Sequence, residues 1–328
     1  MKNPATTGGR VELINAAQVG VGRWGRNIAR TIRDDVAGIN LACVATSRED
    51  IRDLIGEDCD VVTDWRDVLD RRGIDAVFLA VPAVWHTKMT SAFVSAGIAV
   101  FVEKPLCLSS QDGRALLKDV ELAGGIVHVD HIDLHNPAVI AIHDRAKSAG
   151  PLQRIVGRIG AAYERRADIS PLWEYAPHFI AVCLKAGIGT CLDVDAARIT
   201  PEPPFESVPG RDLIRLELVF SSGANASMVA GNGMAEKCRT MRFEYDEVHF
   251  VYDDQAVDRL KEVTQTNGDS RVIPLPNIRP LTASIRAFED KVRCGVPTTE
   301  DIQTGIQVAE ILEAASRKIG EPLPQITP

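Results

Sequence analysis

The chain has 328 residues, of which 45% are hydrophobic and 25% charged, and its formal net charge is -8. This composition is typical of a folded protein of two domains and argues against disorder over most of the length. Because no block of lysine or arginine is present, nucleic acid and anionic membranes are disfavoured as main partners.

The seven cysteines are scattered and form no Cys-x-x-Cys pair, so neither a disulfide framework nor a zinc ribbon is indicated. The longest uncharged apolar run, residues 76–85, is too short to span a bilayer. Residues 1–10 lack the apolar core of a signal peptide. We therefore expect a cytoplasmic protein.

Short apolar runs alternate with amphipathic stretches in the first part of the chain. The runs cover residues 16–21, 39–46, 59–64, 75–82, 99–105 and 125–132. This rhythm predicts βαβ units and a parallel sheet, as in a Rossmann dinucleotide-binding domain.

After Pro151 the pattern changes to longer, often alternating runs joined by turn residues. They cover residues 152–165, 211–223, 224–231 and 238–253, and they predict a large, open, mostly antiparallel sheet. Residues 282–295 and 298–320 return to a helical pattern, and each stretch ends on a glycine. We predict an α/β Rossmann domain over residues 1–130 and an α+β domain over residues 131–328.

The first apolar run leads into GVGRWGRNIAR, residues 20–30, which contains the spacing G-x-G-x-x-G at Gly20, Gly22 and Gly25. A tight glycine turn between a strand and a helix lets the backbone approach a pyrophosphate, whose charge the helix N-terminus stabilises. The alternative is a plain strand-to-helix turn. The βαβ context favours dinucleotide binding.

The end of the second strand indicates which dinucleotide binds. Ser47 and Arg48 stand where a carboxylate would hold the ribose 2′-hydroxyl of NAD, and they suit a 2′-phosphate. We therefore predict a preference for NADP(H), with NAD(H) possible. In the alternative, Arg48 is a solvated loop residue, and Glu49 or Asp50 binds the ribose.

Several segments together resemble the glucose-fructose oxidoreductase / inositol dehydrogenase / MocA family of NAD(P)-dependent oxidoreductases. These segments are GVGRWGRN, AVPAVWH, VFVEKPL, VHVDHIDLHNPAV and PLWEYAPHFI, and the closing helices fit as well. The resemblance covers nearly the whole chain. It implies a Rossmann domain, a sugar-like substrate and subunit contacts through the C-terminal sheet, in a homodimer or homotetramer.

The resemblance implies a role for Lys104, which follows Glu103 and precedes Pro105. In the family, the lysine of Glu-Lys-Pro lies beside the nicotinamide. From the residues alone, a cation at a strand end can stabilise an alkoxide, or it can simply face water. The predicted cofactor residues are Gly20, Gly22, Arg23, Trp24, Gly25, Ser47, Arg48, Val81, Pro82, His86, Glu103 and Lys104. For His86 a structural role is an equal alternative.

His178 is the predicted proton-transfer group, because a histidine near neutral pH suits an alcohol dehydrogenation. It lies four residues after Glu174, so one helix would place both side chains on the same face. Alternatively, a helix begins near Pro177 and its positive end lowers the pKa of His178. The family has aspartate where Glu174 stands, which leaves the role of Glu174 open. A core histidine bonded to backbone is the alternative for His178.

The substrate is expected to contact Lys104, Tyr163, Glu174 and His178, although Tyr163 also suits an ordinary sheet residue. His128, His131 and His135 resemble a metal-ligand series, but strand alternation would place His128 and His131 on opposite faces, and we expect no metal. The glycine-rich segment 230–233, which precedes Lys237 and Arg239, replaces the bulk common in sugar-directed relatives.

The sequence therefore predicts hydride transfer between NADP(H) and a secondary alcohol or ketone of a sugar, sugar nucleotide or related polyol. Lys104 would stabilise the oxygen, His178 would move its proton, and Glu174 would assist His178. Two alternatives stay open: a catalytically inactive dinucleotide-sensing regulator, and an imine or biliverdin-type reductase.

Overall fold

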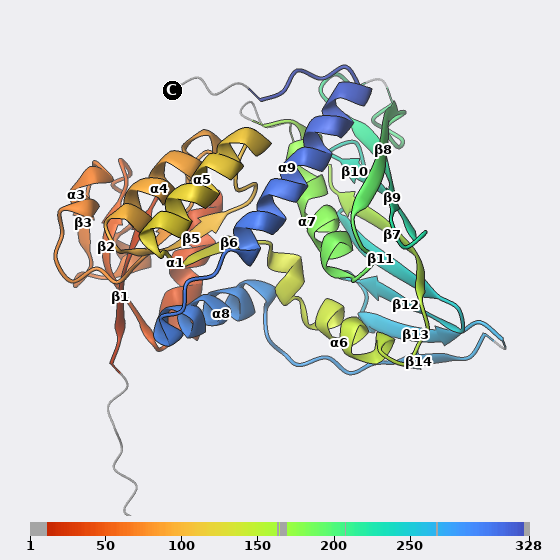
Figure 1. The fold of residues 1–328 in the computed structure, drawn as a ribbon, viewed down its shortest axis with the longest axis horizontal. Helices are drawn as coiled ribbons and strands as arrows, with labels where there is room; N and C mark the ends of the chain where they lie inside the picture. Colours follow the sequence, from red (N-terminus) through yellow and green to blue (C-terminus); the bar gives the residue numbers. More distant parts are fainter. Residues whose placement is uncertain (1–11, 163, 165–168, 207, 267, 325–328) are drawn as a thin grey trace, which may run out of the picture.

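The computed structural model describes residues 12–162, 164, 169–206, 208–266 and 268–324. Its elements form two sheets that lie side by side, with helices between them (Figure 1). The first sheet has the strand order β3-β2-β1-β4-β5-β6, and all of its pairs are parallel. Its strands are β1 (Ile14–Val19), β2 (Ile39–Ala45), β3 (Asp60–Val62), β4 (Ala76–Leu79), β5 (Ala99–Glu103) and β6 (Val127–Asp130).

Helices connect these strands in the predicted βαβ rhythm. They are α1 (Arg23–Asp35), α2 (Arg52–Ile55), α3 (Arg66–Leu69), the short η1 (Ala83–Trp85), α4 (His86–Ser95) and α5 (Ser110–Ala123). Every residue of β4, β5 and β6 is buried, as expected for parallel strands covered on both faces. The strand order is that of a Rossmann sheet, so the predicted fold of this part is confirmed.

The second sheet has the order β14-β13-β12-β11-β7-β10-β9-β8. Its strands are β7 (Leu152–Gly160), β8 (Cys191–Ile199), β9 (Leu213–Phe220), β10 (Asn225–Gly231), β11 (Cys238–Tyr245), β12 (Val248–Asp253), β13 (Leu260–Thr264) and β14 (Ser270–Val272). The pair β7 and β10 is parallel and the other pairs are antiparallel. The mostly antiparallel sheet is thus confirmed, and the alternating burial along β9 shows that one of its faces is uncovered.

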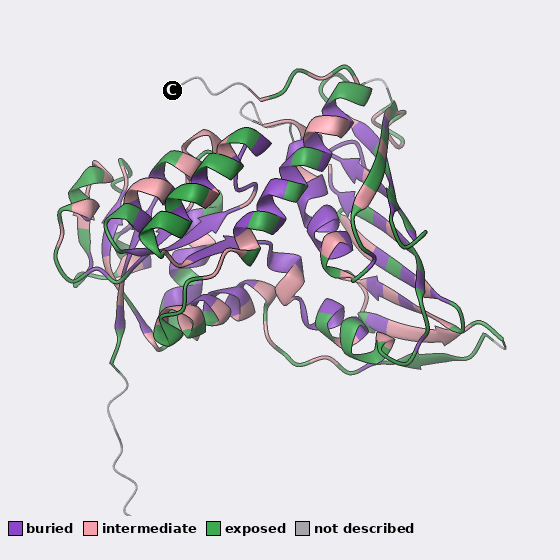
Figure 2. Ribbon diagram, viewed as in Figure 1, coloured by how far each residue is buried: buried purple, intermediate pink, exposed green. Residues whose placement is uncertain are grey.

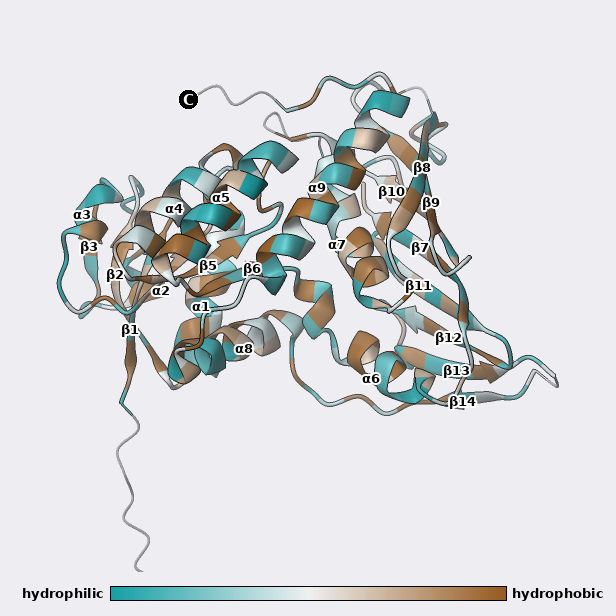
Figure 3. Cartoon of the chain, in the orientation of Figure 1, coloured by the Kyte–Doolittle hydropathy of each residue, from teal (hydrophilic) through white to brown (hydrophobic). Residues whose placement is uncertain are grey.

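Further helices lie on the other face of this sheet and against the first sheet (Figure 1). They are the short η2 (Ile132–His135), α6 (Pro137–Ala146), α7 (Pro171–Lys185), α8 (Pro280–Cys294) and α9 (Glu300–Lys318). Figure 3 shows that α5 and α9 each carry hydrophilic residues on one side and hydrophobic residues on the other. Within the described part of the chain, no helix combines the length and hydropathy that a membrane span needs.

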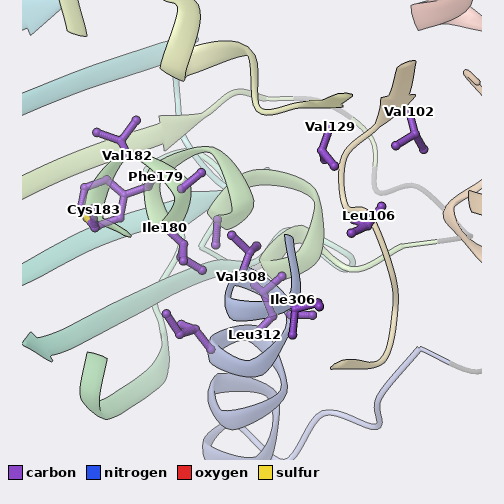
Figure 4. Packing of buried hydrophobic residues seen from close by; sticks show 14 of the residues in the cluster. Val102, Leu106, Val129, Phe179, Ile180, Val182, Cys183, Ile306, Val308 and Leu312 are labelled. Carbon is purple, nitrogen blue, oxygen red and sulfur yellow. The ribbon is translucent and has the colours of Figure 1, made fainter. Parts of the chain in front are cut away.

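One hydrophobic core runs between the two sheets. In Figure 4, Leu106 lies between Val102 of β5 and Ile306 of α9. Phe179 of α7 lies farther from the first sheet, beyond Ile306. A Cβ on Gly305 of α9 would lie 2.7 Å from the Leu106 side chain. The close approach of α9 to this strand end therefore depends on glycine, and it ties the two parts of the molecule together.

The helix α8 packs on the first sheet although it follows the second sheet in the chain. The ring of Phe288 lies 5.4 Å from that of Phe78 and 5.7 Å from that of Phe101. These residues are fully buried, as Figure 2 illustrates for the interior of both sheets. The predicted boundary at residue 130 stays a prediction, but the Rossmann sheet is completed by a helix from the C-terminal part.

Replacing Phe288 tests this packing. Phe288→Ala should lower the free energy of unfolding by about 3–5 kcal/mol, because it removes a fully buried ring. Leu122→Ala on α5 is the control: Leu122 is 88% exposed, and its loss should change stability by less than about 0.5 kcal/mol. Denaturant unfolding measures both. Equal effects of the two substitutions would contradict the packing of α8 on this sheet.

Candidate active site

The glycine turn follows β1 and leads directly into α1. Gly20 has a φ of +89°, and a Cβ there would lie 2.5 Å from the main-chain oxygen of Ala80. A Cβ on Gly25 would lie 2.3 Å from the Gly20 oxygen, whereas a Cβ on Gly22 would meet nothing within 4 Å. The Gln18 amide donates to the Gly20 and Gly25 carbonyls, each at 2.9 Å. The turn is therefore tightly packed on its inner side and open at Gly22.

A hollow of about 370 Å³ opens beside this turn. Its walls come from the carboxyl ends of β1, β2 and β4, where open α/β sheets bind ligands. Six of the predicted cofactor residues line it: Gly20, Gly22, Ser47, Arg48, Val81 and Pro82. Thr63 and Trp65 also line it. Sequence reasoning missed these two because they follow the short strand β3, which carries no motif.

The shape and charge of this cradle fit a dinucleotide. The helix α1 starts at Arg23 with a glycine as its N-cap, and in its described first turn no acidic residue or side-chain cap is present. The positive end of the helix dipole therefore meets the open side of Gly22, where it would stabilise a pyrophosphate.

Arg48 lies at the edge of the hollow and pairs with Asp50 through its Nε at 3.3 Å. Arg26 of α1 pairs with the same carboxylate at 2.6 Å. Hydrogen bonds from Arg48 and Arg26 hold the pKa of Asp50 below its usual value. Two guanidinium groups thus converge on one anionic group beside Ser47. This is an arrangement that also suits a phosphate.

Trp24, in the first turn of α1, is exposed, whereas Glu103 is buried at the end of β5. Asp130 is the partner of Glu103 on the parallel strand β6, and Glu103 Oε1 and Asp130 Oδ2 have no hydrogen-bond partner among the described residues. Burial raises the pKa of Glu103 well above its usual value and raises that of Asp130 to about 6. Both carboxyl groups therefore keep a proton to a higher pH than a solvated carboxyl group does.

His86 is fully buried at the start of α4. Its Nδ1 lies 2.8 Å from the carbonyl of Pro105, and its Nε2 lies 2.9 Å from the carbonyl of Val81. The ring thus joins the loops that follow β5 and β4. This geometry favours the structural alternative, and contact of His86 with a cofactor stays a prediction.

Lys104 is the first residue beyond β5, a central strand between β4 and β6. Its ammonium donates to the main-chain carbonyl of Glu174 in α7 at 2.8 Å. Pro177 lies in the interior of this helix and has no N–H, so α7 carries a break in its hydrogen-bond ladder close to that carbonyl. A helix of the second domain therefore binds the cation at the edge of the first.

His178 lies one turn after Glu174 and is buried in α7. The helix spans residues 171–185, so the alternative that it begins near Pro177 is wrong. Burial is the main reason that the pKa of His178 lies well below its usual value, and the charges of Lys104 and Arg239 lower it further. The imidazole is therefore neutral at pH 7 and can accept a proton.

A carboxylate beside the imidazole comes from Asp133 in η2. Its Oδ2 lies 3.8 Å from His178 Nδ1, which is beyond hydrogen-bond distance, and its Oδ1 accepts from Arg239 at 3.1 Å. Asp133 belongs to a buried hydrophobic turn, and only its place directly after the strand β6 could have indicated a functional role. The pairing with Arg239, 106 residues away, was not predicted.

His131 lies next to this group. Its ring is buried, and neither nitrogen has a hydrogen-bond partner among the described residues. Burial lowers the pKa of His131 to about 4, and its ring lowers the pKa of His178 through electrostatic repulsion. Lys104 thus lies within electrostatic range of two buried imidazoles, those of His131 and His178.

Two predicted site residues and the metal expectation remain. Glu174 contacts Lys104 through its main-chain carbonyl, and the role of its carboxylate stays a prediction. Tyr163 lies outside the described residues. In the part of the chain that the structure describes, no three or more His, Cys, Asp or Glu side chains gather in a way that could hold a metal ion.

A larger cavity, of about 890 Å³, lies away from this chemistry. Residues of α6, the C-terminal end of α7, the start of β7 and the turn before β10 line it, together with Phe243 and Tyr245 of β11. Lys104, His178 and the glycine turn do not line it. We place the candidate active site at the junction of Lys104 and His178, because the perturbed titratable groups gather there.

Comparison with known proteins shows which proteins the chain resembles. Residues 14–131 match the model of an oxidoreductase family with an NAD-binding Rossmann fold. The scyllo-inositol 2-dehydrogenase (NAD⁺) of Bacillus subtilis is 28% identical over 204 residues, which make up 61% of this chain and 58% of that protein. The chain thus spans less than two thirds of the length of this curated relative.

Solved structures match over a longer part of the chain. A Magnetospirillum magnetotacticum protein described as an oxidoreductase has a TM-score of 0.84 and 29% identity, covering 93% of this chain and 100% of its own. UDP-N-acetylglucosamine 3-dehydrogenase of Acidithiobacillus ferrooxidans has a TM-score of 0.79 and 19% identity, covering 93% and 97%. At 19% identity, the similarity to UDP-N-acetylglucosamine 3-dehydrogenase shows the fold alone. The predicted family resemblance and fold are confirmed.

The open side of the glycine turn yields a test that needs no substrate. Gly22 has an ordinary φ of -71° and open space around its Cα, so Gly22→Val should leave the unfolding temperature unchanged. The valine would project toward the proposed pyrophosphate and weaken the binding of NADPH and NADH by about tenfold or more. Gly22→Ala should give a smaller loss. Calorimetric titration measures the affinities, and unchanged binding by Gly22→Val would place the dinucleotide elsewhere.

Proposed function

Because residues 14–131 belong to the oxidoreductase family with an NAD-binding Rossmann fold, we propose that the protein transfers hydride between a nicotinamide dinucleotide and a secondary alcohol or ketone. The observation that carries this proposal is the contact between Lys104 and α7. It holds an ammonium one helical turn from the neutral His178, at the carboxyl edge of the Rossmann sheet.

The two side chains supply complementary chemistry. When bound, the nicotinamide accepts or donates the hydride. The ammonium of Lys104 stabilises negative charge that develops on the substrate oxygen. The neutral imidazole of His178 accepts the hydroxyl proton during oxidation and returns it during reduction. Its low pKa keeps it in the accepting form at neutral pH.

The neighbours of His178 adjust this chemistry. Once His178 is protonated, the Asp133 carboxylate at 3.8 Å becomes an ion-pair partner of the imidazolium. Arg239 holds Asp133 in place and compensates its charge while the imidazole is neutral. We propose that Asp133 takes the supporting role that the sequence suggested for Glu174.

The proposed cofactor preference is NADP(H) over NAD(H). It rests on Ser47, Arg48 and Arg26, which surround the position where a ribose 2′-phosphate would lie. The Asp50 carboxylate, which both arginines bind, would be displaced by that phosphate. The contribution of Arg26 was not expected from the sequence, since it lies on α1, 22 positions before Arg48.

The proposed substrate is a sugar, a sugar nucleotide or a related polyol. The names of the relatives support this class, since one acts on scyllo-inositol and another on UDP-N-acetylglucosamine. By the family resemblance, we propose a homodimer or homotetramer whose contacts use the uncovered face of the second sheet. A cytoplasmic location stays a prediction.

Lys104→Met tests the proposed mechanism. It removes the charge but keeps most of the side-chain volume, so NADPH binding should persist while turnover falls by about 10²–10⁴-fold. Lys88→Met, at an exposed position of α4, is the matched control and should retain full turnover. The assay follows reduced-nicotinamide absorbance with a panel of keto-sugars and nucleotide sugars. Binding of NADPH without turnover of any substrate by the unaltered protein would favour the regulator.

Arg48→Ala tests the cofactor preference. The dissociation constant of NADPH should rise by about tenfold, because a charge-assisted bond to the 2′-phosphate is lost, while that of NADH should not change. Arg30→Ala, at an exposed position of α1, is the control. Tighter binding of NADH than of NADPH by the unaltered protein would reverse the preference.

A further inference from the structure

A continuous line of buried polar side chains runs from the candidate active site to the surface. It begins at the buried carboxyl pair of Glu103 and Asp130, which are register partners on β5 and β6, beside Lys104. Ser284 of α8 donates to Asp130 Oδ1 at 2.6 Å and lies 3.0 Å from His128 Nε2. Apolar side chains surround this line, so each polar atom in it depends on its neighbours.

At the outer end of the line, one nitrogen of His128 lies close to both a cation and an anion. The Nδ1 of His128 lies 3.2 Å from Lys291 Nζ and 3.3 Å from Asp301 Oδ2. Lys291 and Asp301 also bind each other at 2.6 Å, and their side chains are 25% and 22% exposed. The line therefore reaches solvent between α8 and the start of α9.

The ring of His128 can take either neutral form in this setting. In one form, Nδ1 accepts from Lys291, Nε2–H donates to Ser284, and the Ser284 hydroxyl donates to Asp130. In the other form, a protonated Asp130 donates to Ser284, Ser284 donates to Nε2, and Nδ1–H donates to Asp301. Every partner keeps a hydrogen bond in both forms, because Nδ1 has a donor and an acceptor within reach.

The surroundings of His128 favour the neutral ring. It stacks on Phe101 at 5.1 Å, and His135 lies 5.1 Å away. Burial is the main reason that its pKa lies well below the usual value, and the charge of Lys291 lowers it further. Asp301 opposes this effect without reversing it. The ring can therefore accept a proton at Nε2 and release one from Nδ1, and it is neutral at neutral pH both before and after the transfer.

We propose that these side chains form a proton path between the proposed active site and solvent. A change from the second form to the first carries one proton from Asp130 Oδ1 to Asp301 Oδ2, because Asp130 protonates Ser284, Ser284 protonates Nε2 and Nδ1 releases its proton to Asp301, and no electrons move. The path rests on the proposed function, because each alcohol oxidation sends both electrons to the nicotinamide as hydride and leaves one proton to be removed.

The inner end of the path meets the active site at Lys104. Its ammonium lowers the pKa of both Glu103 and Asp130, and it lowers that of His178, so it lies within electrostatic range of all three. In the proposed sequence, Lys104 gives a proton to the carboxyl pair and takes the substrate's proton from His178. The pair then passes one proton to Ser284, and the charge on Lys104 is restored.

The first experiment measures the tautomer of His128 in the full-length protein and needs no substrate. Nitrogen NMR of ¹⁵N-histidine-labelled protein at pH 6–8 should show a neutral His128 ring that averages between both tautomers, assigned with His128→Gln. Ser284→Ala should shift the ring to the Nδ1–H form, because Nε2 loses its partner and a buried unpaired N–H is costly. A ring fixed in one tautomer and insensitive to Ser284→Ala would overturn the path, as would a charged ring.

Thr282→Ala is the matched control for this measurement. Thr282 is a buried hydroxyl residue on the same helix, and it donates to Asp35 at 3.0 Å rather than to the path. Its replacement should leave the His128 tautomers unchanged. Comparing the unfolding temperatures of the two variants separates a loss of stability from a change in the path.

The second experiment connects the path to turnover. Ser284→Ala should lower kcat by about tenfold and increase its solvent deuterium isotope effect, because proton release becomes slower. Thr282→Ala should change neither, and Ser284→Thr should restore most of the loss. Unchanged kcat and isotope effect in Ser284→Ala would overturn the role of the path in catalysis. An unaltered protein that oxidises no alcohol would refute the proposed function, whereas the NMR result would still decide whether the path exists.

Discussion

The hydrogen bond from the Lys104 ammonium to the Glu174 carbonyl joins the two halves of the molecule at the proposed reaction centre. One partner emerges from the Rossmann sheet, and the other belongs to a helix that packs on the second sheet. The Lys104 ammonium is partly buried, and removing a charged group from water without an oxygen partner is costly. The position of α7, and with it that of His178, is therefore coupled to the strand end that carries the lysine.

The same cation organises the titratable groups around it. Burial lowers the pKa of His178 and His131, and the charge of Lys104 lowers it further, while burial raises the pKa of Glu103 and Asp130. The site thus combines neutral imidazoles with carboxyl groups that lose their protons at a higher pH than usual. Reversible proton transfer near neutral pH requires groups whose pKa values are shifted in opposite directions in this way. The proposed reaction therefore accounts for the gathering of perturbed pKa values at this edge of the sheet.

Contacts between residues far apart in the chain form the outer part of the proposed proton path. The helix α8 returns to the Rossmann sheet late in the chain, where Phe288 fills the apolar face and Ser284 reaches Asp130 across a separation of 154 residues. The beginning of α9 then adds Asp301 to the exposed end. A helix whose apolar side chains secure the first domain thereby also contributes the proposed proton path.

The sequence by itself determined the Rossmann rhythm, the glycine turn and the place of Lys104 at a strand end, because strand alternation, turn geometry and apolar runs act over a few residues. Only the tertiary structure decided that Asp133 lies beside His178, that Arg239 binds Asp133, and that Ser284 meets His128. These pairs join side chains far apart in the chain, and their contacts depend on how whole helices pack on two sheets, which no local pattern encodes.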